Sequence, residues 1–324
     1  MYLVTGGAGF IGSHLVEALV ERGERVRVFD NFSTGRREFL RPWEGKIEVV
    51  EGDLRELAAV RRAVEGVEFV LHQAALRSVL RSVDDPLSTD DVNVRGTLHL
   101  LVASRDSGTV RRLVYASSSS VYGDRPELPK REDQLPSPIS PYAVSKLTGE
   151  YYCRVFSHLY GLETVSLRYF NVFGPRQSPE SKYAAVIPLF LQACFRGEPA
   201  EVHGDGLQSR DFTYIDNVVE ANLLALAAPG VAGEVFNVAC GERHTLLEIL
   251  DVFERFSGRP IARRHTAPRP GDVRHTEASI EKARERLGYR PKVGFEEGLR
   301  RTYEYFRRTW GVGQDEIDLG KTRG

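Results

Sequence analysis

The sequence predicts an α/β fold, in which a doubly wound parallel sheet is joined to a smaller C-terminal α+β domain. Through the first half, short β-branched runs alternate with amphipathic stretches, which is typical of βαβ units. The predicted strands are almost wholly apolar, as expected where helices cover both faces of a sheet. After about residue 170, helical stretches are separated by short strands and Pro/Gly turns, which indicates the second domain.

Before residue 170 the alternation predicts six strands and four helices. The strands span 2–5, 25–29, 46–50, 67–72, 111–117 and 163–169, and the helices lie near 11–22, 54–65, 87–107 and 141–160. Further helices are predicted near 183–196, 216–228, 245–257, 278–287 and 295–308. We expect residues 1–170, with an interleaved segment near 212–240, to form the sheet domain. Residues 171–310 then form mainly the smaller domain, and 311–324 form a polar tail.

The composition is that of an ordinary soluble globular protein. The 324 residues are 41% hydrophobic and 27% charged, and the formal net charge is −1, so nucleic acid and membrane surfaces are poor partners. The longest apolar run, YAAVIPLFL, is too short to span a bilayer, and the N-terminus lacks a signal-peptide pattern. Cys153, Cys194 and Cys240 have no CxxC spacing, which argues against disulfides and a metal site and favours the cytoplasm.

The stretch YLVTGGAGFIGSHLVEALV places four glycines directly after the first strand and at the start of a helix. They are Gly6, Gly7, Gly9 and Gly12. Glycines at such a turn let the backbone approach a pyrophosphate, which then lies on the helix N-terminus. Strand, glycine turn, helix and second strand together predict a dinucleotide-binding domain of Rossmann type.

Two aspartates follow the next strands and bear on the choice of cofactor. Asp30 ends the second strand, 18 residues beyond Gly12, where a carboxylate accepts the ribose hydroxyls of NAD and repels the 2′-phosphate of NADP. Arg36 and Arg37 nearby would weaken this preference. Asp53 ends the third strand, and two interpretations stand side by side: contact with the adenine edge, or capping of the following helix.

Tyr142 and Lys146 lie four residues apart at the start of a predicted helix, so both side chains occupy one helix face. An unperturbed phenol has a pKa of about 10, too high for a base at neutral pH. A neighbouring ammonium and a cationic nicotinamide would both favour the phenolate. Upstream, the strand at 111–117 runs into the serine run ASSSS, whose last member is Ser120.

TGGAGFIG, the serine-rich strand end and YAVSK together resemble the extended short-chain dehydrogenase/reductase family, in its nucleotide-sugar epimerase/dehydratase group. The resemblance runs from Met1 to about Trp310. It implies NAD as cofactor, Tyr142 as the base, Lys146 as the group that positions it, and Ser118 as the assisting hydroxyl. It also implies contacts to the cofactor from Gly6, Gly9, Phe10, Ile11, Gly12, Asp30, Asn31, Ser33, Gly35, Asp53, Leu54, Gln73, Ala74, Ala75, Asn93, Tyr142, Lys146, Tyr169 and Val172.

The second half matches the same group in the stretches LRYFNVFGPRQ, SRDFTYIDNV and RPGDVRH. The resemblance implies a UDP-sugar as substrate, with Arg210 and Arg269 on its diphosphate. Two arginines suit phosphate oxygens because each makes charge-assisted hydrogen bonds. The residues expected at the substrate are Ser78, Ser118, Ser119, Ser120, Tyr142, Asn171, Val186, Arg210, Arg269, Asp272 and Thr276.

The residues directly after the strand at 111–117 differ between the enzymes of this group that catalyse different reactions. Similar dehydratases carry an Asp-Glu pair there and similar decarboxylases a Glu, because elimination needs a further acid or base. This chain has Ser118, Ser119 and Ser120 instead. What remains is oxidation at C4, turning of the 4-keto sugar, and return of the hydride from the other face, which predicts a 4-epimerase.

SSSSVYGDRPELPK and RPGDVRHT closely resemble bacterial UDP-N-acetylglucosamine 4-epimerases. At the position of Thr276, related enzymes restricted to plain hexoses carry a Tyr, and the smaller Thr leaves space for a 2-acetamido group. Arg77 and Arg81 depart from the usual loop and would suit a carboxylated sugar if they face it. The sequence thus predicts a 4-epimerase of UDP-N-acetylhexosamines that also acts on UDP-glucose and UDP-galactose. A glucose-only epimerase, a uronate 4-epimerase, a reductase or dehydratase of the same fold, and a catalytically silent dinucleotide-binding regulator stay open. Helices near 90–107 and 141–160 match those that pair in family homodimers.

Overall fold

The computed structural model of the chain describes residues 1–180, 184–268 and 273–310; the predicted tail, 311–324, lies outside them. Its centre is a parallel sheet with the strand order β11-β6-β5-β4-β1-β2-β3, which confirms the predicted fold class. The strands are β1 (Tyr2–Thr5), β2 (Val26–Asp30), β3 (Ile47–Glu51), β4 (Phe69–His72), β5 (Arg112–Ser118), β6 (Glu163–Tyr169) and β11 (Glu234–Val238). All six predicted strands are present: β1 and β6 have the predicted bounds, and the ends of the other four are shifted by at most two residues.

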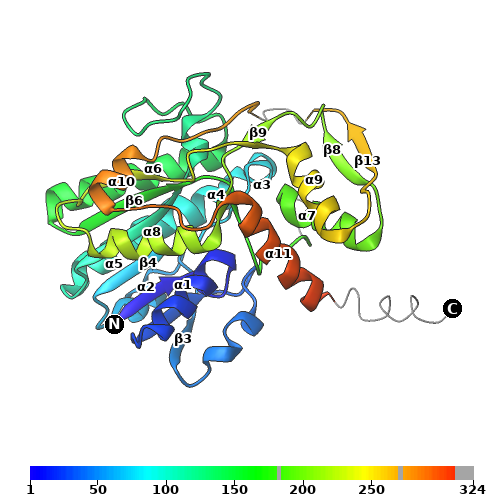
Figure 1. Ribbon diagram of the computed structural model, residues 1–324. Helices are drawn as coiled ribbons and strands as arrows, with labels where there is room; N and C mark the ends of the chain where they lie inside the picture. Colours follow the sequence, from blue (N-terminus) through cyan, green and yellow to red (C-terminus); the bar gives the residue numbers. More distant parts are fainter. Residues whose placement is uncertain (181–183, 269–272, 311–324) are drawn as a thin grey trace.

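Helices cover both faces of this sheet (Figure 1). One face packs on α2 (Leu57–Val64), α5 (Gly96–Ser107) and α6 (Pro141–Tyr160), and the other on α1 (Phe10–Glu21) and α8 (Ile215–Ala227). Successive side chains of a strand point to opposite faces. Accordingly, Leu113 and Tyr115 of β5 join the α2/α5/α6 core, whereas Val114 and Ala116 join the core under α1 and α8.

The predicted helix at 87–107 is not one regular helix. It divides into α4 (Pro86–Asp90), the π-helical turn η3 (Asp91–Arg95) and α5. A short helix that we did not predict, α3 (Val79–Asp84), precedes them. Single π-turns inside helices frequently occur at functional sites, and this one contains Asn93, to which we return below.

The seventh strand, β11, comes from the second half of the chain and pairs in parallel with β6. We expected a segment near 212–240 to join the sheet domain but did not predict this strand. Its sequence, EVFNV, is only five residues long and includes two polar ones. Such a run has too little periodicity to stand out from a loop.

A second lobe lies beside the sheet and contains β8, β13, α7 and α9 (Figure 1). Its helices are α7 (Val186–Arg196) and α9 (Leu246–Ser257), and β8 (Ala200–His203) pairs in parallel with β13 (Arg263–Thr266). Two small strand pairs lead into it, β7 (Val172–Phe173) with β10 (Thr213–Tyr214) and β9 (Ser209–Arg210) with β12 (His244–Thr245). The remaining helices are α10 (Glu281–Leu287), α11 (Phe295–Thr309) and the 3-10 turns η1 (Arg37–Phe39), η2 (Arg41–Trp43) and η4 (Ser119–Tyr122).

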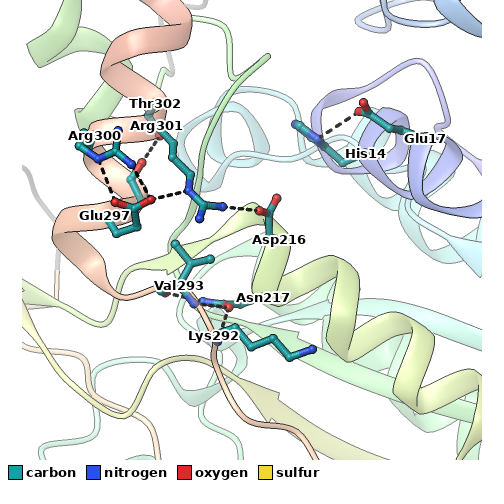
Figure 2. Close-up of polar contacts among 11 residues, drawn as sticks. His14, Glu17, Asp216, Asn217, Lys292, Val293, Glu297, Arg300, Arg301 and Thr302 are labelled. Carbon is teal, nitrogen blue, oxygen red and sulfur yellow. Dashed lines mark hydrogen bonds and ion pairs between the residues drawn. The ribbon is translucent and has the colours of Figure 1, made fainter. Parts of the chain in front are cut away.

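Polar contacts fix α11 at the junction of the two lobes, as Figure 2 shows. Arg301 on α11 bridges Glu297 of its own helix, at 2.7 Å, and Asp216 at the start of α8, at 3.1 Å. Beside it, the side-chain oxygen of Asn217 accepts the backbone N–H groups of Lys292 and Val293 at 2.8 and 3.1 Å. Within the described residues, no helix is both long and apolar enough to cross a membrane.

Close packing of α6 on β5 depends on a glycine. A β-carbon added to Gly149 would lie 2.2 Å from the hydroxyl oxygen and 2.4 Å from the ring of Tyr115, which is fully buried in β5. Real β-carbons do not approach other atoms so closely, so any larger residue would push the helix away from the strand.

We therefore predict that Gly149→Ala destabilises the protein by about 1–3 kcal/mol, the usual range for an overpacked core. At an unconstrained helical position the same change would stabilise the protein by roughly 1 kcal/mol, because alanine is the better helix former. The sign of the change, measured by urea unfolding, is the test. A stabilised variant would show that α6 does not need this close approach.

Candidate active site

The glycine loop between β1 and α1 forms the floor of a long cleft at the carboxyl edge of the sheet. Gly6 has a φ of +66°, and a β-carbon there would lie 2.8 Å from the Ala74 backbone. A β-carbon at Gly12 would lie 2.1 Å from the Gly6 carbonyl oxygen. The loop therefore leaves a cradle that side chains would fill. The cleft is lined by fourteen of the predicted cofactor residues: Gly6, Gly9, Phe10, Ile11, Gly12, Asp30, Asn31, Ser33, Gly35, Asp53, Leu54, Gln73, Ala74 and Ala75.

Asp30 lies where the ribose of a dinucleotide would be selected. Its carboxylate accepts the backbone N–H groups of Ala8 and Phe32 at 2.9 and 2.8 Å, and burial raises its pKa. Arg36 pairs with Glu38 and Glu180. Arg37 pairs with Glu51 and stacks on the Phe32 ring at 3.8 Å. Because both arginines have partners of their own, a preference for NAD over NADP is favoured.

For Asp53, one of the two interpretations is wrong. The N-cap position of α2 is held by Glu56, which makes no side-chain capping bond. Asp53 instead accepts two hydrogen bonds from the Arg55 guanidinium, at 2.9 and 2.8 Å, and one from Asn31 at 2.9 Å. Its hydrogen bonds with Arg55 hold the pKa of the carboxyl far below its usual value. Asp53 thus presents a fixed negative charge to the cleft.

Ser118, Tyr142 and Lys146 meet where β5 ends and α6 begins. Pro141 occupies the first turn of α6, and the Ser140 hydroxyl accepts the Ala143 N–H at 3.2 Å, so the helix starts directly before Tyr142. The Tyr142 N–H in turn donates to the Ser82 hydroxyl at 3.0 Å. Lys146 is buried, and its Nζ donates to the Ala116 carbonyl of β5 at 2.8 Å.

Burial acts against both charges that we expect to serve catalysis, the phenolate of Tyr142 and the ammonium of Lys146. It raises the pKa of Tyr142, while a hydrogen bond with Ser118 and the positive charge of Arg77 act in the opposite direction. It lowers the pKa of Lys146 to about 8, so the ammonium is only moderately stable at neutral pH. The neighbouring ammonium that we expected to favour the phenolate is thus itself near its titration range.

Two of the predicted cofactor residues make contacts that organise the walls of the cleft. The Asn93 amide group, held by the π-turn η3, bonds the Leu76 N–H and carbonyl at 2.8 and 3.0 Å and the Ser145 hydroxyl at 3.1 Å. It thereby ties the loop after β4 to α6. The Tyr169 hydroxyl bonds both Gln73, at 3.2 Å, and Asn222, at 2.9 Å.

A second cavity, of about 500 Å³, opens in the smaller lobe. Among the residues that line it are Asn171, Val186 and Arg210, predicted for the substrate, and Val172, predicted for the cofactor. Aromatic side chains that we did not predict, Phe190 and Phe212 among them, form its apolar wall. Arg269 and Asp272, also expected at the substrate, lie outside the described residues.

The backbone around this cavity is held by Asp211, a residue that sequence reasoning missed. Its carboxylate accepts the N–H groups of Cys240, Gly241 and Ala278 at 2.9, 3.0 and 3.2 Å. Burial raises its pKa to about 7 in spite of these donors. Asp211 therefore joins three segments far apart in the sequence, and the only local signal was its place between Arg210 and Phe212.

Three of the hydroxyls expected at the sugar lie in the turns that follow β4 and β5. Ser78 caps α3: it has a φ of +142°, and its hydroxyl accepts the Arg81 N–H at 3.1 Å. Ser119 and Ser120 lie in η4, and the Ser120 N–H donates to the Ser118 hydroxyl at 3.2 Å. Within the described part of the chain, the buried Ser120 hydroxyl has no hydrogen-bond partner. A buried polar group without a partner is costly, which fits a ligand contact at this point.

Comparison with known proteins places this geometry in context. Residues 2–239 match the family described as NAD dependent epimerase/dehydratase. A UDP-glucose 4-epimerase structure from Thermotoga maritima with UDP-glucose is 39% identical, with a TM-score of 0.91 over 95% of this chain and 99% of that one. A UDP-N-acetylglucosamine 4-epimerase structure from Methanobrevibacter ruminantium is 38% identical, with a TM-score of 0.90 over 95% and 98%. The UDP-glucuronate 4-epimerase of Thermodesulfobacterium geofontis is 34% identical over 94% of this chain and 95% of its own.

We predict that Tyr142→Phe lowers kcat for a sugar nucleotide by roughly 100-fold or more, because that is the usual contribution of a positioned acid or base. Binding should persist, because the ring and the packing of α6 are unchanged. Isothermal titration with UDP and a turnover assay separate the two effects. Full activity in this variant would exclude Tyr142 as the base.

Proposed function

The chain belongs to the NAD-dependent epimerase/dehydratase family, and we propose that it is a 4-epimerase of UDP-sugars that acts on UDP-N-acetylglucosamine and UDP-N-acetylgalactosamine. NAD is its cofactor. One observation carries the choice of reaction: the strand end beside Tyr142 offers only hydroxyls, from Ser118 to Ser120. The neighbouring carboxylate of Glu150 is buried and paired with Arg168, so it is not available as a second acid or base.

The cofactor supplies the oxidation of the sugar at C4 and the return of the hydride. For this chain's own residues, the geometry supports a short proton path: Tyr142 takes the proton of the 4-hydroxyl, and Ser118 hydrogen-bonds the same centre. Lys146 stabilises the phenolate from its place on the next turn of α6. Because the serine run from Ser118 to Ser120 holds no further acid or base, the 4-keto sugar can react further only by being reduced again at C4.

The acetylated substrate is supported by Thr276. Its backbone N–H donates to the Ser209 carbonyl at 3.0 Å, and its hydroxyl accepts from the Asn171 side chain at 3.4 Å. Asn171 lines the cavity of the smaller lobe, and its bond to Thr276 supports a position for Thr276 beside that cavity. A threonine occupies much less volume than a tyrosine, so the space of a phenol ring is left for a 2-acetamido group.

A second candidate, a uronate 4-epimerase, is favoured by Arg77. This residue lines the cofactor cleft, and its charge acts on Tyr142, so it lies near the reacting centre. A guanidinium there would attract the carboxylate of a hexuronic acid. Plain UDP-glucose is the third substrate to compare, since relatives with each of the three specificities align along nearly the whole chain.

The decisive experiment is to incubate the purified protein, without added NAD, with UDP-glucose, UDP-N-acetylglucosamine and UDP-glucuronate separately. We expect the N-acetylhexosamine pair to interconvert with the highest kcat/KM. Highest turnover of UDP-glucuronate would favour the second candidate. A protein that binds NAD but converts none of the three would instead be a catalytically silent regulator.

We further predict that Thr276→Tyr reduces kcat/KM for the acetylated substrate by about 10-fold or more, equivalent to about 1.4 kcal/mol of steric exclusion. Activity on UDP-glucose should fall by less than about threefold. Thr276→Ser is the matched control, because it keeps the hydroxyl and the small volume. If the tyrosine variant lost kcat/KM equally on both sugars, Thr276 would not be the residue that makes room for the 2-acetamido group.

We also propose that the protein works as a homodimer, in the cytoplasm. One face of α6 carries exposed apolar side chains at Val144, Tyr151, Val155 and Leu159, and Leu87 on the adjacent α4 is 82% exposed. Several exposed large apolar side chains on one helix face are typical of an interaction surface. The helix predicted at 141–160, which corresponds to α6, matches one of the two helices that pair in family homodimers. A second copy is therefore the expected partner.

We predict that Leu159→Glu converts the dimer to a monomer, because a charge placed in an apolar interface must be desolvated without a partner. Leu135→Glu is the matched control, since Leu135 is 75% exposed but lies outside α6. Light scattering after gel filtration measures both. A wild-type monomer, or an unchanged dimer in the Leu159 variant, would exclude this interface.

A further inference from the structure

Behind the catalytic residues lies a buried ion pair that the reaction described above does not use. Glu150 on α6 and Arg168 on β6 are each 3% exposed. The Arg168 guanidinium donates two hydrogen bonds to the Glu150 carboxylate, from Nε at 2.9 Å and from Nη2 at 2.7 Å. The Ser117 hydroxyl donates a third, at 2.5 Å. These three residues are called the Glu150 cluster below.

The Glu150 cluster joins the two elements that carry catalysis. Ser117 directly precedes Ser118 on β5, and it is paired with Arg168 in the register of β5 and β6. Glu150 follows Lys146 by one helical turn, and Lys146 itself bonds the carbonyl of Ala116, the residue before Ser117. The end of β5 is therefore bonded to α6 at two consecutive residues, once through Lys146 and once through Glu150.

Stability alone is a weak reason for such a pair. Removing two charges from water costs several kcal/mol, and well-packed apolar residues often serve as well or better. The hydrogen bonding of this pair is also incomplete, because within the described residues the buried Nη1 of Arg168 has no hydrogen-bond partner. The guanidinium lies instead over the Tyr122 ring, 4.6 Å from its centre.

Charge gives a better reason. The other titratable groups that face Lys146 are Tyr142 and Cys153 on α6, Tyr115 on β5 and His72 on β4. Burial lowers the pKa of His72 to about 3, raises that of Cys153 to about 12, and raises those of Tyr115 and Tyr142. Glu150 is the further neighbour whose charge acts to raise the pKa of Lys146. Its carboxylate accepts hydrogen bonds from the Arg168 guanidinium and from Ser117, which is the geometry of an ion pair.

We propose that Glu150 is a positioning residue for catalysis: its carboxylate, held by Arg168 and Ser117, fixes the end of β5 against α6 and supplies the negative charge that retains Lys146 as an ammonium beside Tyr142. The inference rests on the proposed epimerase function only for its kinetic readout. The charge of Lys146 can be followed without any substrate.

The test is a ¹³C NMR titration of the lysine side chains, which is practical because the chain holds only seven lysines. The signal of Lys146 is assigned by its loss in Lys146→Arg. We expect Glu150→Gln to lower the pKa of Lys146 by about one pH unit, because the nearby negative charge is gone and Arg168 is uncompensated. Arg168→Met should raise it by about as much, since the carboxylate then acts without its partner.

The matched control is Glu163→Gln, which removes the Arg112–Glu163 ion pair, at 2.5 Å, from the opposite end of the same two strands. It should leave Lys146 unchanged. If Glu150→Gln leaves the pKa of Lys146 unchanged, or if both cluster variants shift it in the same direction, the proposal is wrong, because a purely structural disturbance has no reason to follow the sign of the charge.

The kinetic arm measures 4-epimerisation against pH. In Glu150→Gln the alkaline limit of kcat should move to lower pH, and in Arg168→Met to higher pH, with KM nearly unchanged. Should these two variants fail to fold, Ser117→Ala decides: kcat about fivefold lower at constant KM supports the proposal, on the scale of one lost hydrogen bond, and wild-type kcat overturns it. A wild-type protein inactive on every UDP-sugar refutes the proposed function, while the NMR titration still tests Glu150.

Discussion

The contact between α6 and the end of β5 is the constraint on which the rest of the site depends. Gly149 lets the helix approach the Tyr115 ring, and Lys146 then reaches the Ala116 carbonyl at 2.8 Å. Only in this arrangement do the first turn of α6 and the last residue of β5 meet, bringing Tyr142 to Ser118. The cleft after the glycine loop includes Arg77, whose charge acts on Tyr142. Three of the residues expected at the substrate line the cavity of the smaller lobe.

The protonation states of Tyr142 and Lys146, the proposed catalytic pair, depend on their surroundings as well as on the two groups themselves. Burial disfavours both the phenolate of Tyr142 and the ammonium of Lys146. Nearby charges therefore decide how far each is available, and they come from separate elements: Arg77 after β4 and Glu150 on α6. The absence of a carboxylate from the serine run matters for the same reason, because a negative charge there would oppose formation of the phenolate.

Sequence patterns predicted those features of the molecule that are contained within a short stretch of the chain. The strands β1 to β6, the glycine loop and the Tyr142–Lys146 spacing each lie within a short window, where periodicity and turn chemistry are strong. What could not be predicted joins distant segments. Asp211 binds backbone at Cys240 and Ala278, and Glu150 meets Arg168 and Ser117. A buried aspartate or glutamate looks like a surface charge until its partner is known. Asn93 was expected at the cofactor. Its three hydrogen bonds to Leu76 and Ser145 depend on a π-turn that the residue pattern did not predict.

The position of β11 has a consequence for how the chain is made. β6 is complete at Tyr169, but the strand that covers its outer edge begins only at Glu234. During synthesis, at about 5–20 residues per second, that edge stays open for several seconds. An unpaired apolar strand is a template for wrong partners. We expect nascent chains of intermediate length to be the forms most prone to aggregation and most dependent on chaperones, whereas the finished protein buries the edge.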